Sequence, residues 1–396
     1  MSVFGIVSEF NPFHKGHEYL IKCARNMGAD SVVCVMSGNA TQRGELSIMD
    51  KYDRAEAAVF GGADLVLELP FPWSSASAES FALAGIYVLS SFCDTVIFGS
   101  ESGDIELLKR VAEYTLSDDF VENYNYLLET GNQSARAYVT LVYNKFGVQL
   151  SSNELLGVEY IKAAKRLGLD LDFVTVKREG SAFLSKEMTY NSFDSAMAIR
   201  TVIEKGAVIE GLEHSLPQRS YELVREVKSD GEITEQDKYT EFAMMYYRLF
   251  ENISDEKFAE CEGGILERIQ NTARSCDTSG MFWYLLSTKR YTDTKLRRSV
   301  LYGMCRVHPE DVFSPSLPAY TLLLAASRGG RELLSGTKRK EERIRVVTKP
   351  ADVSLLTDEA AIRQAMLSQR LDMIYSLCRT VPTQPGSYIK KKPYIT

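Results

Sequence analysis

Four apolar stretches near the start of the chain restrict its fold more than any other feature. They are VFGIVSEF (3–10), DSVVCVMSG (30–38), DLVLELPF (64–71) and DTVIFGSE (94–101). Each stretch is almost continuously apolar over the length of a strand, and a segment with helical periodicity separates it from the next. Strands that are apolar on both sides are typical of parallel sheets covered by helices on both faces. The pattern predicts an α/β fold with a Rossmann-like doubly wound parallel sheet.

The remainder of the chain has a mainly helical pattern. Helical periodicity extends over residues 104–170, a strand is predicted at 172–180, and a further helix at 192–206. From about residue 215 the pattern is helical almost throughout, with one late strand candidate in ERIRVVTKP. We therefore predict two domains, a sheet domain over residues 1–212 and a mainly α-helical C-terminal domain over residues 213–396.

The composition is that of a globular protein, with 45% hydrophobic and 25% charged residues. No apolar run reaches the roughly 18–20 residues that a membrane span needs. The first residues lack the basic stretch and the small-residue cleavage site of a secretory signal, so a cytoplasmic location is expected.

Seven cysteines occur singly and without a CxxC pair. They predict reduced, largely buried thiols and no zinc ribbon.

The charge is distributed unevenly along the chain. Residues 281–350 contain 14 Lys and Arg against 6 Asp and Glu, a local charge of +8 in a chain whose net charge is −7. A basic segment in an acidic chain predicts a polyanion partner, and a solvated helix face is the alternative. The densest part of this segment contains Lys289, Arg290, Lys295, Arg297 and Arg298, and residues 338–340 and 390–392 add further charge.

A histidine pair follows directly on the first predicted strand. In EFNPFHKGHEYL, His14 and His17 lie three residues apart with Gly16 between them. The carboxyl edge of a parallel sheet is where such folds bind ligands, and a helix N-terminus there attracts anions. Asn11-Pro12 would make the turn, and Gly16 would let a phosphate approach the backbone. The histidines would donate hydrogen bonds to a polyphosphate and, when protonated, offset its charge.

Two other interpretations of the histidine pair remain. The rings could be ordinary surface or core histidines, which is the common outcome for an isolated HxxH pattern. They could also bind zinc, but the metalloprotease helix requires HExxH spacing with its glutamate base. Here the spacing is three and no glutamate follows His14. We predict a phosphate-binding role and no metal site.

At this point NPFHKGH resembles the HxGH signature of the nucleotidyltransferase superfamily, whose histidines contact the phosphates of ATP. The stretch SFDSAMAIR (192–200) resembles the second motif of that superfamily, I-S-S-T-x-I-R, through Ser195, Ile199 and Arg200. It departs from the motif at Ala196 and Met197, where hydroxyl side chains would be expected. The resemblance implies that Arg200 binds the β- or γ-phosphate, and a solvated helix arginine is the alternative.

Several stretches, in order along most of the chain, are similar to one branch of that superfamily, the bacterial tRNA(Met) cytidine acetate ligases. They are SEFNPFHKGHEYL, VMSGNATQRGE, GADLVLELPF, FGSESGD, NELLGVEY and STKRYTDTKLRR. The resemblance implies that ATP and acetate react to acetyl-adenylate and pyrophosphate. The acetyl group would then pass to N4 of the wobble cytidine of elongator tRNA(Met).

This resemblance also implies the cofactors and partners. ATP would bring Mg as its counter-ion, with no tightly bound metal or organic cofactor, no membrane and no obligate protein partner. Two other functions remain possible on the sequence. One is a small-molecule adenylyltransferase, which leaves the basic helical half unexplained, and the other is a non-catalytic nucleotide-sensing RNA-binding protein.

The resemblance further implies a set of site residues. His14 and His17 would stabilise the leaving pyrophosphate. The implied ATP ligands are Val7, Ser8, Glu9, Phe10, Asn11, Pro12, Phe13, Lys15, Gly16, Leu20, Gly99, Asn153 and Arg178, with Ser195 and Arg200 from the second motif. Tyr291 accompanies the basic cluster Lys289, Arg290, Lys295, Arg297 and Arg298, which would bind tRNA.

Some of these positions have structural alternatives. Gly99 could be a turn glycine, Asn153 the N-cap of a helix, and Arg178 a solvated loop residue. Gly38 and residues 42–44, which follow the second strand, could border the acetate or cytidine pocket or form an ordinary turn. Phe282, Trp283 and Tyr284 are expected in the core rather than as a stacking surface. Asp64 and Glu68 could orient substrate, cap the entry of a strand or pair with a nearby basic residue, and we assign them no catalytic role.

Overall fold

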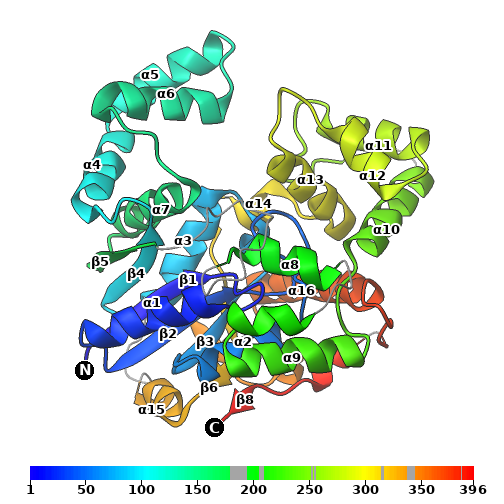
Figure 1. Ribbon diagram of the computed structural model, residues 1–396. Helices are drawn as coiled ribbons and strands as arrows, with labels where there is room; N and C mark the ends of the chain where they lie inside the picture. Colours follow the sequence, from blue (N-terminus) through cyan, green and yellow to red (C-terminus); the bar gives the residue numbers. More distant parts are fainter. Residues whose placement is uncertain are drawn as a thin grey trace.

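The computed structural model describes residues 1–178, 194–204, 209–250, 253, 256–313, 316–336, 344–384 and 386–396. The basic residues 338–340 and the first two residues of SFDSAMAIR lie outside the described residues. In the first half the elements are β1 (Val3–Ser8), α1 (Lys15–Asn26), β2 (Ser31–Ser37), α2 (Lys51–Phe60), β3 (Leu65–Leu69), α3 (Ala78–Leu89), β4 (Thr95–Ser100), α4 (Ile105–Thr115), α5 (Asp118–Glu129), α6 (Ser134–Phe146), α7 (Ser152–Leu167), β5 (Asp172–Lys177) and α8 (Ala196–Glu204) (Figure 1).

In the second half helices predominate. The elements are α9 (Gln218–Ser229), α10 (Gln236–Leu249), α11 (Ile265–Ser275), α12 (Ser279–Leu286), α13 (Asp293–Cys305), α14 (Pro309–Val312), β6 (Tyr320–Ala326), α15 (Arg328–Gly336), β7 (Arg345–Val347), α16 (Glu359–Leu377) and β8 (Tyr394–Ile395). No described helix combines the length and the apolar character that crossing a membrane requires.

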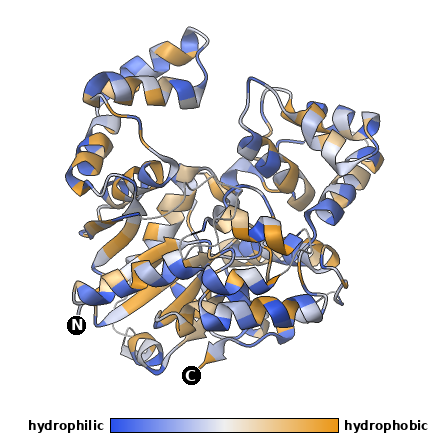
Figure 2. Cartoon of the chain, viewed as in Figure 1, coloured by the Kyte–Doolittle hydropathy of each residue, from blue (hydrophilic) through white to orange (hydrophobic). Residues whose placement is uncertain are grey.

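The described strands form one eight-stranded sheet, in the order β5-β4-β1-β2-β3-β6-β7, with β8 also paired to β6. Strands β5, β4, β1, β2 and β3 are mutually parallel. Figure 2 shows these strands as the most hydrophobic ribbons of the molecule, with helices on both sides. The prediction of a doubly wound parallel sheet from the four apolar stretches is confirmed.

Alternate residues of the central strands point into two separate apolar layers. On β2, Val33 and Val35 belong to the layer that contains α3 and α7, whereas Cys34 and Met36 belong to the layer that contains α1, α2 and α9. Because the sheet is buried on both faces, only its strand ends leave room for a ligand site. All seven cysteines are free thiols, and six of them are buried.

The prediction that the second half is helical almost throughout is wrong at β6. YTLLLAA is a short apolar run, and periodicity alone does not distinguish such a run from a buried helix segment. β6 pairs antiparallel with β3 and parallel with β7 and β8, so the second half completes the sheet of the first. The strand candidate ERIRVVTKP is confirmed as β7. The division into residues 1–212 and 213–396 stays a proposal.

Ser47, the serine of SIMDKYD, does not begin helix α2. The Ser47 hydroxyl donates to the carbonyl of Gly38 at 3.1 Å, and so it belongs to the loop that precedes α2. The side chain of Asp50 accepts the N–H of Tyr52 at 3.0 Å and caps the helix instead. The connection between β2 and α2 therefore extends from Gly38 to Asp50.

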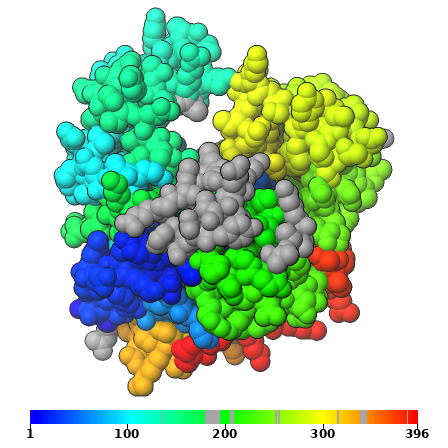
Figure 3. All heavy atoms as spheres, viewed as in Figure 1, coloured from blue at the N-terminus to red at the C-terminus, as the bar shows by residue number. Residues whose placement is uncertain are grey.

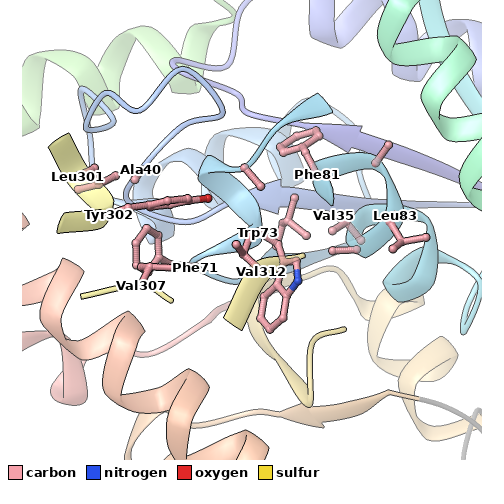
Figure 4. Close-up of a cluster of buried hydrophobic side chains, with 14 of the residues drawn as sticks. Val35, Ala40, Phe71, Trp73, Phe81, Leu83, Leu301, Tyr302, Val307 and Val312 are labelled. Carbon is pink, nitrogen blue, oxygen red and sulfur yellow. The ribbon is translucent and has the colours of Figure 1, made fainter. Parts of the chain in front are cut away.

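Side chains from both halves of the chain share one core. Figure 4 shows Val35 of β2, Phe71 and Trp73 after β3, and Tyr302 of α13 in a single cluster. The Tyr302 hydroxyl also lies 3.2 Å from the carbonyl of Pro72 and 3.0 Å from that of Ser75. The helices of the second half thus pack directly against the segment that follows β3.

Two helical lobes extend from the sheet layer. α4, α5 and α6 form one lobe, and α10 to α13 form the other (Figure 1). Figure 3 shows that the surface is hollowed between them. The side-chain amide of Gln133, at the start of α6, donates to the carbonyl of Lys289 in the second lobe. The two lobes are therefore in contact across this hollow.

Candidate active site

The turn between β1 and α1 brings the two histidines of the HxGH stretch together. His14 is the N-cap of α1, with φ −128° and ψ 172°. Its Nδ1 accepts the N–H of Gly16 at 3.0 Å, and Nδ1 of His17 accepts the N–H of His14 at 3.2 Å. The pair forms a capping box built from two imidazoles. Because each Nδ1 is an acceptor, each neutral ring carries its proton on Nε2, where it can donate to a phosphate.

The two imidazole rings are stacked, with centroids 3.7 Å apart and planes inclined by 25°. The rings of Phe10 and Phe13 lie 4.8 and 5.7 Å from that of His17. A Cβ atom on Gly16 would lie 2.8 Å from Cε1 of His14. The glycine of the motif is therefore required because the His14 ring folds back over the helix N-terminus.

Burial and nearby arginines keep both rings neutral in the free protein. Burial, with the positive charges of Arg178 and Arg200, lowers the pKa of His14 to about 3, against a smaller opposing effect of Asp194. Burial and the neighbouring His14 lower the pKa of His17 well below its ordinary value. The expectation that protonated histidines supply positive charge does not hold for the free protein. The positive charge near the pair is that of Arg178 and Arg200, and the imidazoles are neutral.

The lowered pKa of His14 predicts a pH-dependent stability. The unfolded chain takes up a proton at His14 below about pH 6.5, whereas the folded chain does not until about pH 3. Stability is therefore lost as the pH falls through this window. We expect H14N, which keeps an N-cap oxygen, to lose about 2 kcal/mol less unfolding free energy than the wild type between pH 6.5 and 4.5. Urea unfolding of both proteins at pH 6.5 and 4.5 measures this difference. An equal loss of unfolding free energy in H14N and in the wild type would contradict the prediction.

Arg200 connects the second motif to the first. Its Nη1 donates to the carbonyl of Asn11 at 2.7 Å, while Asn11 Oδ1 accepts the N–H of Ile48 at 2.8 Å. The Ser195 hydroxyl accepts the N–H of Ala198 at 3.1 Å, at the start of α8. The structure therefore brings Arg200 to the HxGH turn, and it excludes the alternative of a solvated helix arginine.

Three later ATP-site candidates meet at Glu101, just after β4. Asn153 Nδ2 donates to Glu101 Oε1 at 2.8 Å, and Nε of Arg178 lies 3.7 Å from the same oxygen. A Cβ atom on Gly99 would lie 3.1 Å from Cγ of Arg178. The N-cap of α7 is Ser151, so the N-cap alternative for Asn153 is wrong. Glu101 was not predicted, although it lies in the quoted FGSESGD.

The remaining residues of the first ATP segment divide into buried and half-buried positions. Phe10, Asn11, Pro12 and Phe13 are buried, and Val7, Ser8, Glu9, Lys15, Gly16 and Leu20 are half-buried. Lys15 Nζ donates to the carbonyls of Glu213 and His214 at 3.2 and 2.8 Å. Phe10 and Phe13 support His17 from the core side.

Comparison with known proteins agrees with this geometry. The model of the HIGH Nucleotidyl Transferase family matches residues 1–387. The tRNA(Met) cytidine acetate ligase of Thermotoga maritima is 34% identical over 359 residues, covering 86% of this chain and 85% of the relative. That of Acetivibrio thermocellus is 32% identical over 408 residues, covering 96% of both. This chain belongs to the tRNA(Met) cytidine acetate ligase family.

Solved structures agree with this family membership. The crystal structure of apo Thermotoga maritima TmcAL superposes with a TM-score of 0.91 at 30% identity, covering 100% of this chain and 99% of that one. A second crystal structure of that protein, bound with alpha-thio ATP, gives a TM-score of 0.90 with the same coverage. The resemblance and the nucleotidyltransferase-like fold inferred from the sequence are confirmed.

In this family member the loop after β2 lies against the HxGH turn. The N–H of Gln42 donates to Glu9 Oε1 at 2.9 Å. A side chain at Gly38 would collide with the carboxylate of Glu68, which accepts from Lys51 Nζ at 2.8 Å. Asp64 forms an ion pair with Arg25. Both acids therefore pair with a basic residue, which was one of the three interpretations of the sequence.

The predicted tRNA-binding residues differ in their surroundings. Lys289 and Arg290 are exposed. Arg298 instead forms an ion pair with Glu260. Its Nε donates to Oε1 and Oε2 at 3.0 and 2.9 Å, its Nη2 lies 2.8 Å from Oε2, and its side chain is 11% exposed. Lys295 pairs with Glu262. These pairs leave the exposed end of the cluster, near residue 290, as the part best placed to meet a polyanion.

The aromatic residues beside this cluster are divided between core and surface. Arg297 lies over the ring of Trp283 at 4.4 Å and 3.4 Å from Glu45 Oε1. Phe282 is fully buried, as expected, but Tyr284 is 78% exposed, so the core interpretation is wrong for that residue. Its position in α12 points away from the α10–α13 core.

Proposed function

We propose that this protein activates acetate with ATP and transfers the acetyl group to N4 of the wobble cytidine of elongator tRNA(Met), forming N4-acetylcytidine. The observation that carries this proposal is the histidine capping box beside Arg178 and Arg200, in a chain of this family. Acetate does not react with an exocyclic amine until it is joined to a good leaving group, and an adenylate supplies one.

The first step would place charge where these residues lie. A carboxylate oxygen of acetate attacks the α-phosphorus of ATP, the bond to the β-phosphate oxygen breaks, and pyrophosphate leaves. Nε2–H groups of His14 and His17 would donate to the leaving phosphates, and Arg178 and Arg200 would supply positive charge. Preorganised donors of this kind stabilise a transition state without reorganising.

The second step transfers the acetyl group. N4 of the cytidine attacks the acetyl carbonyl carbon, AMP leaves, and N4 loses a proton. Gly38 and residues 42–44 remain proposed borders of the acetate or cytidine pocket, and Gly99 and Asn153 remain proposed ATP ligands. Asn153 would have to share its amide with Glu101, or exchange it for the nucleotide.

Mg would enter with ATP as the counter-ion of its phosphates. Within the described ranges, no group of three or more His, Cys, Asp or Glu side chains is placed to hold a metal ion. The ion would therefore take its oxygen ligands mainly from the phosphates and water, as Mg²⁺ commonly does in nucleotide sites. We propose no organic cofactor, and a cytoplasmic location where tRNA and ATP are both present.

Radiolabelled acetate offered with ATP, Mg and total tRNA tests the proposal directly. Label recovered in a cytidine of one tRNA species is the expected result, and absence of label from RNA would reject it. A second assay, pyrophosphate exchange into ATP without tRNA, should depend on acetate. Exchange that depends instead on a phosphorylated nucleotide or pantetheine would indicate a small-molecule adenylyltransferase. ATP binding without any turnover would indicate a nucleotide-sensing RNA-binding protein.

The helical half, residues 213–396, would carry most of the tRNA contacts. Lys289 and Arg290 lie at an exposed position where phosphate neutralisation would give salt-dependent affinity. We expect K289E/R290E to weaken tRNA binding at least tenfold and to reduce its salt dependence, while acetate-dependent pyrophosphate exchange stays unchanged. K109E/K165E, on exposed lysines of α4 and α7, is the matched charge control. Equal tRNA affinities of the two double variants would mean that Lys289 and Arg290 are solvent-exposed charges that do not contact tRNA.

A further inference from the structure

Arg54 on α2 is fully buried, yet each of its guanidinium nitrogens is bonded to the main chain. Nε donates to the carbonyl of Met49 at 2.9 Å, and Nη1 donates to the carbonyls of Glu9 and Ser37 at 2.6 and 3.2 Å. Nη2 donates to the carbonyl of Gly38. One side chain therefore holds four main-chain carbonyl groups.

These carbonyls belong to two different strand ends. Ser37 is the last residue of β2, and Glu9 immediately follows β1. Gly38 and Met49 are the two ends of residues 38–49, which we call the acceptor-side loop because they border the proposed acetate or cytidine pocket. Arg54 thus joins the start of the HxGH turn to both ends of the acceptor-side loop.

Two further hydrogen bonds join the same segments. The N–H of Gln42 donates to Glu9 Oε1 at 2.9 Å, and that of Ile48 donates to Asn11 Oδ1 at 2.8 Å. On its other side, the acceptor-side loop contacts the second half of the chain. Arg298 Nη1 lies 3.4 Å from the carbonyl of Gln42, and Gln236 donates to the carbonyl of Leu46 at 2.8 Å. The loop is thus held between the HxGH turn and the helices of the second half.

A guanidinium group is the basic side chain best suited to bond these four carbonyl groups. Burying a guanidinium is costly, and burial lowers its pKa even though nearby acidic groups oppose this. The planar group presents five N–H donors in a fixed fork, so it can bond several carbonyls at once. A lysine ammonium is a single donor atom on a flexible stem and cannot span the same four oxygens.

We propose that Arg54 is a positioning residue for adenylation: it holds the HxGH turn and the acceptor-side loop at a fixed separation, so that the carboxylate nucleophile meets the α-phosphate in line. This inference rests on the proposed function. A displacement of about 1 Å at a reacting centre can cost roughly 10²-fold in rate. ATP binding in the ground state has many other contacts and depends less on this separation.

The test compares R54K with R379K by acetate-dependent pyrophosphate exchange. Arg379 is a matched control because it is also buried and bonds the N-cap of the same helix, Asp50, at 2.9 Å. Its other partner is Glu232, after α9, at 2.7 Å. We expect R54K to lower kcat by about 10–100-fold with less than about a threefold change in the KM for ATP. R379K should leave both constants near those of the wild type, even if its stability falls equally.

Three further results would decide the inference. Unchanged kcat in R54K, or an equal loss in R379K, would overturn it, and so would failure of R54K to fold at any temperature at which R379K is folded. Absence of acetate-dependent exchange in the wild type would reject the proposed function instead. In that case amide hydrogen exchange tests separately whether Arg54 holds the acceptor-side loop. The N–H groups of Gln42 and Ile48 should exchange faster in R54K than in R379K. Equal exchange would again overturn the inference.

Discussion

H14A and H17A will each lower the rate of acetate-dependent pyrophosphate exchange by about 10²–10³-fold, the loss typical when one preorganised donor is removed from a charged transition state. Each Nδ1 is bonded to the main chain, so the Nε2–H group is the donor that each variant removes. Because the rings are neutral in the free protein, the loss should not depend on pH between about 6 and 8. Initial rates at saturating ATP and acetate measure the effect.

H14N separates this chemical role from the structural one. An asparagine at the N-cap can still accept the helix N–H groups, whereas an alanine there costs about 1 kcal/mol. We therefore expect H14N to fold with near wild-type stability and to be as inactive as H14A. H308A is the matched histidine control, because His308 lies at the start of α14, in a different part of the chain. Near-normal exchange in H14N would show that the imidazole acts only as a cap.

The sequence predicted the first four parallel strands because each is a continuously apolar run followed by a helical segment. The same reasoning missed β6, because YTLLLAA lies in a segment with a mainly helical pattern, where a short apolar run is not distinguished from a buried part of a helix. The partner of β6 is β3, more than two hundred residues earlier in the chain. Strand pairing over that distance is a tertiary fact, and local periodicity does not contain it.

The candidate site was predictable where it is contiguous in sequence. His14, Gly16 and His17 lie in one short stretch, and its position between the first predicted strand and a helix pointed to a phosphate site. Arg54 and Glu101 were not predicted, because their partners lie on elements far from them in the sequence. The same limit applies to the basic cluster, since a local charge count cannot reveal that Arg298 is neutralised by Glu260.

K51M will lower the free energy of unfolding by about 3–5 kcal/mol, the cost of removing one partner from a buried ion pair. The side chains of Lys51, Glu68 and Asp372 are 3%, 6% and 7% exposed. Lys51 Nζ lies 2.8 Å from Glu68 Oε1 and 3.5 Å from Asp372 Oδ2, so it neutralises carboxylates from β3 and α16 together. Methionine fills a similar volume but leaves both carboxylates buried without a counter-charge.

The pH dependence identifies the cause of this loss. Burial already raises the pKa of Glu68 and of Asp372 in the presence of Lys51, and removal of the lysine will raise both further. Groups whose folded pKa lies above the unfolded value lose stability as the pH rises and regain it as the pH falls. The deficit of K51M should therefore be largest near pH 8 and should shrink towards pH 5 as the carboxyls become protonated.

Urea unfolding of K51M, K51M/E68Q and K109M across this pH range tests the explanation. K51M/E68Q should recover part of the loss, because one of the two uncompensated carboxylates is then neutral. K109M removes an exposed lysine that pairs with Glu106, and it should cost less than about 1 kcal/mol. A K51M deficit that is small or independent of pH would mean that Lys51 contributes packing rather than charge. The carboxylate of Glu68 lies against Gly38 of the acceptor-side loop. Loss of the Lys51 ion pair should therefore also loosen this loop, so that kcat falls together with the free energy of unfolding.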